Sequence, residues 1–171
     1  MNRQYTIGID FGSLSGRAVL MNVNTGEILA TSVYEYPHAV MTERLPDGTV
    51  LGDNVALQHP MDYLEVRSHV VPQVLSLSEV DSSQVVGVGI DFTACTMLPV
   101  DETFQPLCFQ SGYQSEPHAY VKLWKHHAAQ QDADLLTQVA VERNETWLKR
   151  YGGKISSEWM LPKILETLEF H

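Results

Sequence analysis

Residues 6–17 read Thr-Ile-Gly-Ile-Asp-Phe-Gly-Ser-Leu-Ser-Gly-Arg, and this stretch decides how the chain begins to fold. Apolar residues alternate with small or polar ones up to position 11, which predicts a half-buried strand. Its two faces carry different side chains: Tyr5, Ile7, Ile9 and Phe11 on one, and Thr6, Gly8 and Asp10 on the other. Small residues at 12–16 then predict a tight turn, and the apolar run 18–23 predicts a second strand. The stretch is therefore a β-hairpin with an acidic residue near the end of its first strand.

The turn of this hairpin is suited to bind phosphate. A turn built from glycine and serine can expose unpaired backbone N–H groups that cradle an anion. Phosphoryl transfer needs charge neutralisation and positioning, so Asp10 can hold Mg²⁺ through water, Gly12, Ser13 and Ser15 can donate to a terminal phosphate, and Arg17 can add positive charge. A Walker loop is excluded because it needs a lysine and a following helix. The residues alone leave an alternative, which is an ordinary hairpin turn with Asp10 and Arg17 in solvent.

The composition indicates a globular α/β protein and excludes some partners. The 171 residues are 44% apolar and 19% charged, which suits one domain with a sizeable core. A net charge of −10 argues against nucleic acid and anionic membranes as partners. Cys95 and Cys108 lack metal-ligand spacing, as do the seven histidines, and no apolar run reaches membrane-spanning length. These features favour reduced thiols, no structural zinc and a cytoplasmic location.

The order of predicted elements after the hairpin indicates a mixed sheet. Turn residues at 24–27 precede a third strand at 28–36, and helical spacing follows at 60–77, where Pro72 is expected to kink or split the helix. The run 84–91 predicts a buried parallel strand. This order of three antiparallel strands, a crossover helix and a parallel strand resembles the start of a ribonuclease-H-like domain. Between them, 37–60 contains a possible hairpin at Asp47-Gly48 and is either a solvated loop or an excursion that reaches a ligand or a neighbouring subunit.

A second candidate site follows the parallel strand, at Asp-Phe-Thr-Ala-Cys-Thr, residues 91–96. Ligands of open α/β sheets bind beyond the carboxyl ends of the strands, and small residues there let the backbone approach a polyol closely. The alternative is that Thr93 and Thr96 only cap a turn.

The remaining chain predicts shorter elements. Strands are expected at 98–101 and 104–109, a helix at 118–128, and a helical pattern at 132–151 that ends at Gly152-Gly153. Ser156 or Ser157 is expected to cap a last helix from Pro162, whose apolar face includes Trp159, Ile164, Leu165, Leu168 and Phe170. No internal repeat is apparent.

The hairpin sequence at 8–17 resembles the first phosphate motif of the FGGY carbohydrate kinases, members of the actin-like, ribonuclease-H-like ATPase superfamily. Across all 171 residues, the blocks at 91–96, 123–130 and 154–166 are similar to the branch of that family that phosphorylates L-ribulose. The resemblance implies ATP and Mg²⁺ as cofactors and a role in L-arabinose catabolism. It also implies sugar contacts, firmly for Thr93, Ala94, Cys95 and Thr96 and weakly for Lys125 and His126. His126 is a departure, because relatives usually have Asp there.

The resemblance further implies that residues 1–171 are the first part of an N-terminal domain. The catalytic aspartate and a C-terminal ATP-binding domain lie beyond the corresponding region in that family, so no catalytic residue is expected in this chain. The oligomeric state stays open, with a homo-oligomer as one possibility. Three alternatives remain: a kinase for another ketopentose or polyol, a non-catalytic sugar-binding module, and an actin-like or chaperone-like ATPase that shares only the hairpin.

Overall fold

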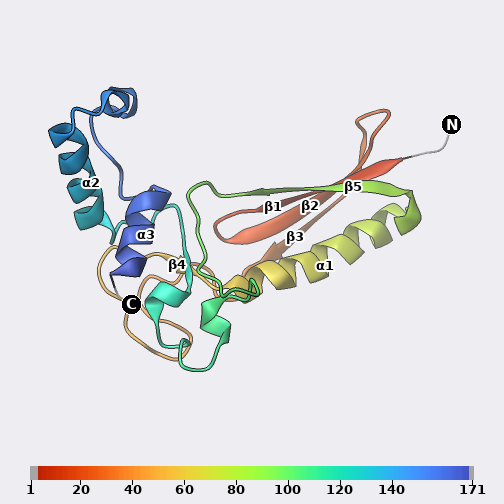
Figure 1. The fold of residues 1–171 in the computed structure, drawn as a ribbon. Helices are drawn as coiled ribbons and strands as arrows, with labels where there is room; N and C mark the ends of the chain where they lie inside the picture. The colour runs from red at the N-terminus through yellow and green to blue at the C-terminus, as the bar shows by residue number, and fades with distance from the viewer. Residues whose placement is uncertain (1–3, 170–171) are drawn as a thin grey trace. The chain divides into compact units, whose positions relative to one another are not determined.

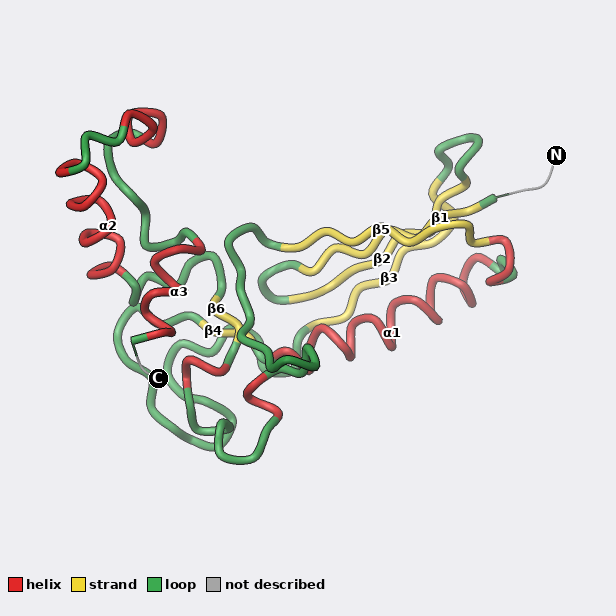
Figure 2. Tube along the Cα trace, in the orientation of Figure 1, coloured by secondary structure: helices red, strands yellow, loops and turns green. Residues whose placement is uncertain are grey.

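The computed structural model describes residues 4–169 and divides the chain into two compact units. Unit 1 comprises Met1–Ala39 and His59–Thr93, and unit 2 comprises Val40–Gln58 and Ala94–His171. Unit 1 contains a sheet with one long helix, and unit 2 is mostly loops and short helices (Figures 1 and 2). Within the described residues, none of the helices is long and apolar enough to be a membrane span.

The sheet of unit 1 has the predicted mixed topology. Its strand order is β3-β2-β1-β5, in which β1, β2 and β3 are antiparallel neighbours and β5 runs parallel to β1. The strands are β1 (Tyr5–Phe11), β2 (Ser15–Asn22), β3 (Ile28–Glu35) and β5 (Val85–Phe92). Helix α1 (Pro60–Ser78) and the 3₁₀ turn η1 (Ser82–Gln84) form the crossover to β5. The predicted α/β meander and crossover are therefore confirmed.

Helix α1 packs along one face of this sheet (Figure 1). Val66, Val70 and Val74 are fully buried beneath it and contact the cluster that includes Ile7 and Leu20. Burial of this valine row removes apolar surface from water and supplies most of the driving force for docking the helix. Pro72 was predicted to kink or split the helix, and the splitting is wrong, because α1 runs unbroken through Pro72. Pro72 is exposed, so the carbonyl that loses its intrahelical partner faces water while the packed face continues.

The prediction that strand β5 is buried is wrong. Val86, Val88, Ile90 and Phe92 are each more than half exposed. Their register with β1 puts them on the same face as Ile7, where α1 packs mainly on β2 and β3. The apolar run at 84–91 therefore predicts the parallel strand correctly. In the described chain, however, no helix covers the apolar face of β5.

Unit 2 begins with the excursion at 40–58, which is not a solvated loop. The predicted hairpin at Asp47-Gly48 is confirmed by a bridge between Arg44 and Val50. The buried leucines Leu45, Leu51 and Leu57 join a core cluster with residues of 107–120. Strand β4 (Leu57–Gln58) then pairs with β6 (Val121–Lys122).

The strands predicted at 98–101 and 104–109 and the helix predicted at 118–128 are wrong. These regions form isolated bridges and the 3₁₀ turns η2 (Leu107–Phe109) and η3 (Pro117–Ala119). One cause is Asp101, whose Oδ1 accepts from the backbone N–H of Thr103 and Gln105 at 2.8 and 3.0 Å. A carboxylate that satisfies local N–H groups stabilises a turn in competition with a strand.

The C-terminal helices follow the predicted pattern with two corrections. The pattern predicted over 132–151 is divided: helix α2 spans Gln130–Glu142 with Arg143 as its C-cap, and the 3₁₀ segment η4 spans Thr146–Tyr151. Segment η4 ends at Gly152, which has the positive φ of 74° typical of a C-cap. Helix α3 spans Met160–Leu168, and neither predicted serine caps it. Ser156 Oγ accepts from the N–H of Glu158 in the preceding turn, and Ser157 Oγ lies 3.1 Å from His127 Nδ1. Phe170 lies outside the described residues.

Candidate functional site

The first part of the candidate site is a hollow on the sheet face of unit 1 that lies opposite α1. Asp10 and Arg17 are register partners across β1 and β2, and Arg17 Nε lies 3.4 Å from Asp10 Oδ2 with both side chains about half exposed. The hollow has a volume of about 400 Å³, and its lining includes Gly8, Asp10, Arg17, Gly89 and Asp91. The structure therefore brings two of the predicted phosphate-site residues together.

The same hollow contains a repeat that the sequence analysis missed. Gly-Ile-Asp-Phe occurs at 8–11 and again at 89–92, and the two copies lie side by side in parallel register, Asp10 beside Asp91. Neighbouring residues in register point to the same face of a sheet, so both carboxylates face the hollow. The paired glycines leave space in the hollow, and Val19, the register partner of Gly8, contributes an apolar side chain to its lining. Two carboxylates and one guanidinium suit a hydrated divalent cation better than a bare anion. The repeated tetrapeptide is the feature of the sequence from which Asp91 could have been predicted as a site residue.

The turn beside the hollow differs from its prediction in one respect. The N–H of Gly12 donates to the carbonyl of Ser15 at 2.9 Å, so it is not an unpaired donor for phosphate. A Cβ at Gly12 would lie 3.0 Å from that same carbonyl oxygen, which explains the glycine. Among the described residues, Gly12, Ser13 and Ser15 do not line the hollow. Their contact with phosphate stays a prediction.

The predicted sugar loop connects the two units. Thr93 ends unit 1, and Ala94, Cys95 and Thr96 begin the second segment of unit 2. Ala94 and Cys95 are exposed, and Cys95 has a positive φ of 55°, a strained conformation for a residue other than glycine. The loop is followed by a bridge between Met97 and Lys122.

The two weaker sugar candidates lie in different environments. Lys125 is exposed. His126 is only 2% exposed, its Nδ1 accepts from the N–H of Ala56 at 3.3 Å, and its Nε2 lies 2.9 Å from Glu166 Oε2. Because both ring nitrogens have partners inside unit 2, the structure gives His126 a packing role and does not support the sugar contact.

Helix α3 faces inward with polar residues, which the sequence analysis did not expect. Lys163, Glu166 and Thr167 are buried, whereas Leu161 and Leu168 are about 60% exposed. The exposure of Leu168 agrees with an apolar face that has no packing partner among the described residues. The spacing i, i+3 and i+4 of the three polar residues was the signal, because it places them on one face of a helix.

These residues surround a second buried lysine, Lys122 of β6. Its Nζ donates to Glu166 Oε2 at 2.6 Å and Thr167 Oγ1 at 2.7 Å and lies 2.9 Å from His118 Nδ1. Burial lowers the pKa of Lys122. Burial alone would raise the pKa of Glu166, but hydrogen bonds with His126 and Lys122 lower it to about 2. The cluster thus contains a charged carboxylate with two basic partners and anchors α3 to β6.

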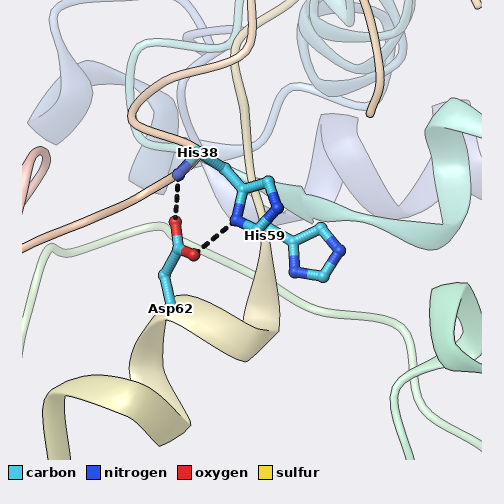
Figure 3. Close-up of side chains that lie close together, drawn as sticks. All are labelled: His38, His59 and Asp62. Carbon is cyan, nitrogen blue, oxygen red and sulfur yellow. Dashed lines mark hydrogen bonds and ion pairs between the residues drawn. The ribbon is translucent and has the colours of Figure 1, made fainter. Parts of the chain in front are cut away.

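Unit 1 contains a separate cluster of His38, His59 and Asp62 (Figure 3). His59 caps α1 by accepting from the N–H of Met61, and the fully buried Asp62 lies 2.6 Å from His38 Nδ1 and accepts from its backbone N–H. The two imidazoles stack at 4.1 Å and 17°. One ligand atom from each of the three side chains lies within 4.8 Å of the other two, but His59 Nδ1 already accepts from Met61 and His38 Nδ1 already pairs with Asp62. The cluster is best explained as a clamp on the N-terminus of α1.

Comparison with curated proteins gives close relatives. The chain is 52% identical over 170 residues to the ribulokinase of Halalkalibacterium halodurans and 55% identical over 169 residues to that of Geobacillus thermodenitrificans. These matches cover 99% and 98% of this chain. The chain spans about 30% of the length of the curated relatives it matches. No protein-family profile matches the chain.

Solved structures share the fold at low identity. The xyloylose kinase of Brucella ovis matches with a TM-score of 0.73 at 13% identity, covering 97% of this chain and 29% of that one. The glycerol kinase of Plasmodium falciparum with ADP matches with a TM-score of 0.64 at 12% identity, covering 98% and 29%. The chain is therefore homologous to ribulokinases over nearly its whole length and has the fold of sugar kinases of the actin-like ATPase type.

Proposed function

We propose that this chain, as a homologue of ribulokinases, is part of an ATP-dependent kinase that converts L-ribulose to L-ribulose 5-phosphate. The observation that carries the proposal is the identity of more than 50% to ribulokinases over nearly the whole chain. Residues 1–171 would form the first part of the N-terminal domain, with the catalytic base and most of the ATP site in other parts of the protein. The enzyme would serve L-arabinose catabolism in the cytoplasm.

The hollow beside the hairpin would bind the phosphates. Asp10 would hold Mg²⁺ through water, and Arg17 would add positive charge, as the 3.4 Å pair at the rim of the hollow supports. Gly12, Ser13 and Ser15 in the adjacent turn would approach the terminal phosphate. Mg²⁺ carried by ATP would neutralise the charge that develops during phosphoryl transfer.

The loop after β5 would contact the sugar. Thr93, Ala94, Cys95 and Thr96 are proposed as one wall of the pocket, because they are small and follow the carboxyl end of a parallel strand. Lys125 is exposed in a neighbouring part of unit 2 and is proposed as a further contact. His126 is left out for the reasons given above.

The proposal is tested with the complete gene product. ADP release should depend on both Mg·ATP and L-ribulose, and kcat/KM for L-ribulose should exceed that for D-ribulose, D-xylulose, L-xylulose and glycerol. Omission of Mg²⁺ should abolish the reaction. If kcat/KM is higher for another polyol, that polyol and not L-ribulose is the substrate. Sugar binding without ADP release would favour a non-catalytic module.

A further inference from the structure

Lys163 of α3 is a buried cation held entirely by backbone carbonyls. Its side chain is fully buried, and its Nζ donates to the carbonyls of Leu123 at 2.7 Å, Cys95 at 2.9 Å and Trp124 at 3.4 Å. A lysine ammonium has three N–H donors, so the three acceptors match its full capacity. Across residues 4–169, no carboxylate lies within ion-pair distance of Lys163, in contrast to Lys122 and its partner Glu166.

The three carbonyls belong to two different loops. Cys95 lies in the loop after β5, and Leu123 and Trp124 lie in the loop after β6 that leads to Lys125. Carbonyl oxygens that converge on one point repel one another unless a cation lies between them. The positive φ of Cys95 adds local strain that some other contact must offset. The ammonium of Lys163 therefore stabilises both the strained loop and its approach to the second loop.

We propose that Lys163 is a positioning residue that holds these two loops together to form the sugar pocket. The inference rests on the proposed function for its substrate, because Ala94 and Lys125 are sugar contacts only in that proposal. The loop geometry itself is shown by the contacts of Lys163, beside the backbone bridge that joins Met97 to Lys122. Small displacements of the groups that position a substrate lower the rate of an enzyme by large factors. Loss of the clamp should therefore lower the activity of the enzyme toward the sugar.

Lys122 offers a matched comparison. It is as deeply buried as Lys163, but its ammonium binds Glu166 and Thr167 and anchors α3 to β6. Its remaining contacts are His118 Nδ1 at 2.9 Å and a carbonyl of α3 itself, that of Lys163, at 3.4 Å. Replacing Lys122 should therefore weaken the fold without removing a bond to the Cys95 or Trp124 carbonyl.

The clamp needs a protonated amine. Burial, with a smaller contribution from the charge of Lys122, lowers the pKa of Lys163 to about 8, although Cys95, Glu158 and Glu166 oppose the shift. Above that pH the neutral amine has two N–H groups for three carbonyls. Sugar affinity of the unmodified enzyme should therefore weaken as the pH rises through about 8.

The test measures sugar and nucleotide kinetics of the complete protein. Lys163→Met should raise KM for L-ribulose by roughly tenfold or more while KM for ATP changes less than about twofold. Lys122→Met should lower the melting temperature with a smaller change in the ribulose KM, and Lys154→Met, at an exposed lysine of unit 2, should change neither. Equal rises in both KM values for Lys163→Met, or an unchanged ribulose KM, would overturn the proposal.

The pH dependence of KM in the wild-type enzyme tests the clamp without a Lys163 variant, and hydrogen exchange tests it without sugar. In the wild-type enzyme, KM for L-ribulose should rise above pH 8 while KM for ATP stays level. A KM for L-ribulose that does not change with pH would contradict the clamp.

Backbone hydrogen exchange should be faster at 94–97 and 123–126 in Lys163→Met than in Lys154→Met. If the wild type phosphorylates no ribulose, the proposed function fails, and the exchange result alone decides whether the loops are clamped.

Discussion

Gly16 of β2 lies directly against Val66 of α1, so closely that a Cβ at Gly16 would be 2.3 Å from Val66 Cγ1. Real Cβ atoms do not approach other carbons to this distance. Val66 is fully buried, so it has no free space into which to move. This glycine of the hairpin motif is therefore needed for helix packing, whatever its neighbours do with phosphate.

We expect Gly16→Ala to lower the free energy of unfolding by about 1–3 kcal/mol, because the added methyl group forces α1 or β2 to shift. Urea unfolding measures the change. Gly52→Ala is the control, since a Cβ at Gly52 would meet no atom within 4 Å and its φ is not positive. The double variant Gly16→Ala with Val66→Ala should lose less stability than the two single changes added together. Strict additivity would contradict a direct clash.

The hairpin and α1 could be predicted because their signals are local. Alternation over 5–11, small residues in the turn and helical spacing after Pro60 each depend on near neighbours. The buried face of α3 could not be predicted in this way. Lys163 and Glu166 are buried only because carbonyls and basic groups from distant segments meet them, and periodicity assigns charged residues to solvent. The register of Asp10 and Asp91 likewise depends on a crossover of many residues.

Asp10→Asn should lower kcat of the complete enzyme by about 10²-fold with little change in the ribulose KM. The carboxylate at the hollow is proposed to organise the metal, and the neutral amide cannot do so. Steady-state kinetics with Mg·ATP measures both constants. Glu27→Gln, which removes an exposed carboxylate at the other end of the sheet, should leave both unchanged. An unchanged kcat for Asp10→Asn would remove Asp10 from the phosphate site.

Ala94→Leu should raise KM for L-ribulose by roughly tenfold and leave KM for ATP within about twofold, because a larger side chain would fill space that the sugar needs. Ala94 is exposed, so the change should leave the melting temperature nearly unaffected. Kinetics for both substrates, with a melting curve, distinguish the outcomes. A parallel rise of both KM values with a lower melting temperature would indicate a folding defect.

The Glu166 cluster should make stability depend on acid pH. The pKa of Glu166 is lowered from 4.5 to about 2 in the fold, so its contribution is full above pH 4.5 and is lost as the pH falls toward 2. We expect Glu166→Gln to destabilise the protein by roughly 3 kcal/mol at pH 6 and by much less at pH 3. Chemical unfolding at both pH values measures this, with the exposed Glu102→Gln as control. A difference between wild type and Glu166→Gln that does not shrink at pH 3 would show that the carboxylate is not charged in the fold.

The exposed apolar row on β5 should make the 171-residue chain self-associate. Val88 and Ile90 are 58% and 65% exposed, and β5 is the last strand of the described sheet, so both an apolar surface and a strand edge are open. We expect the chain to elute larger than a monomer on size exclusion, increasingly so at higher concentration. Replacing both residues by lysine should restore a monomer, because charge on an edge strand opposes pairing with another copy. Val141→Lys, an equally exposed position on α2, should leave the elution unchanged, and a monomer at every concentration of the wild type would show that the row does not drive association.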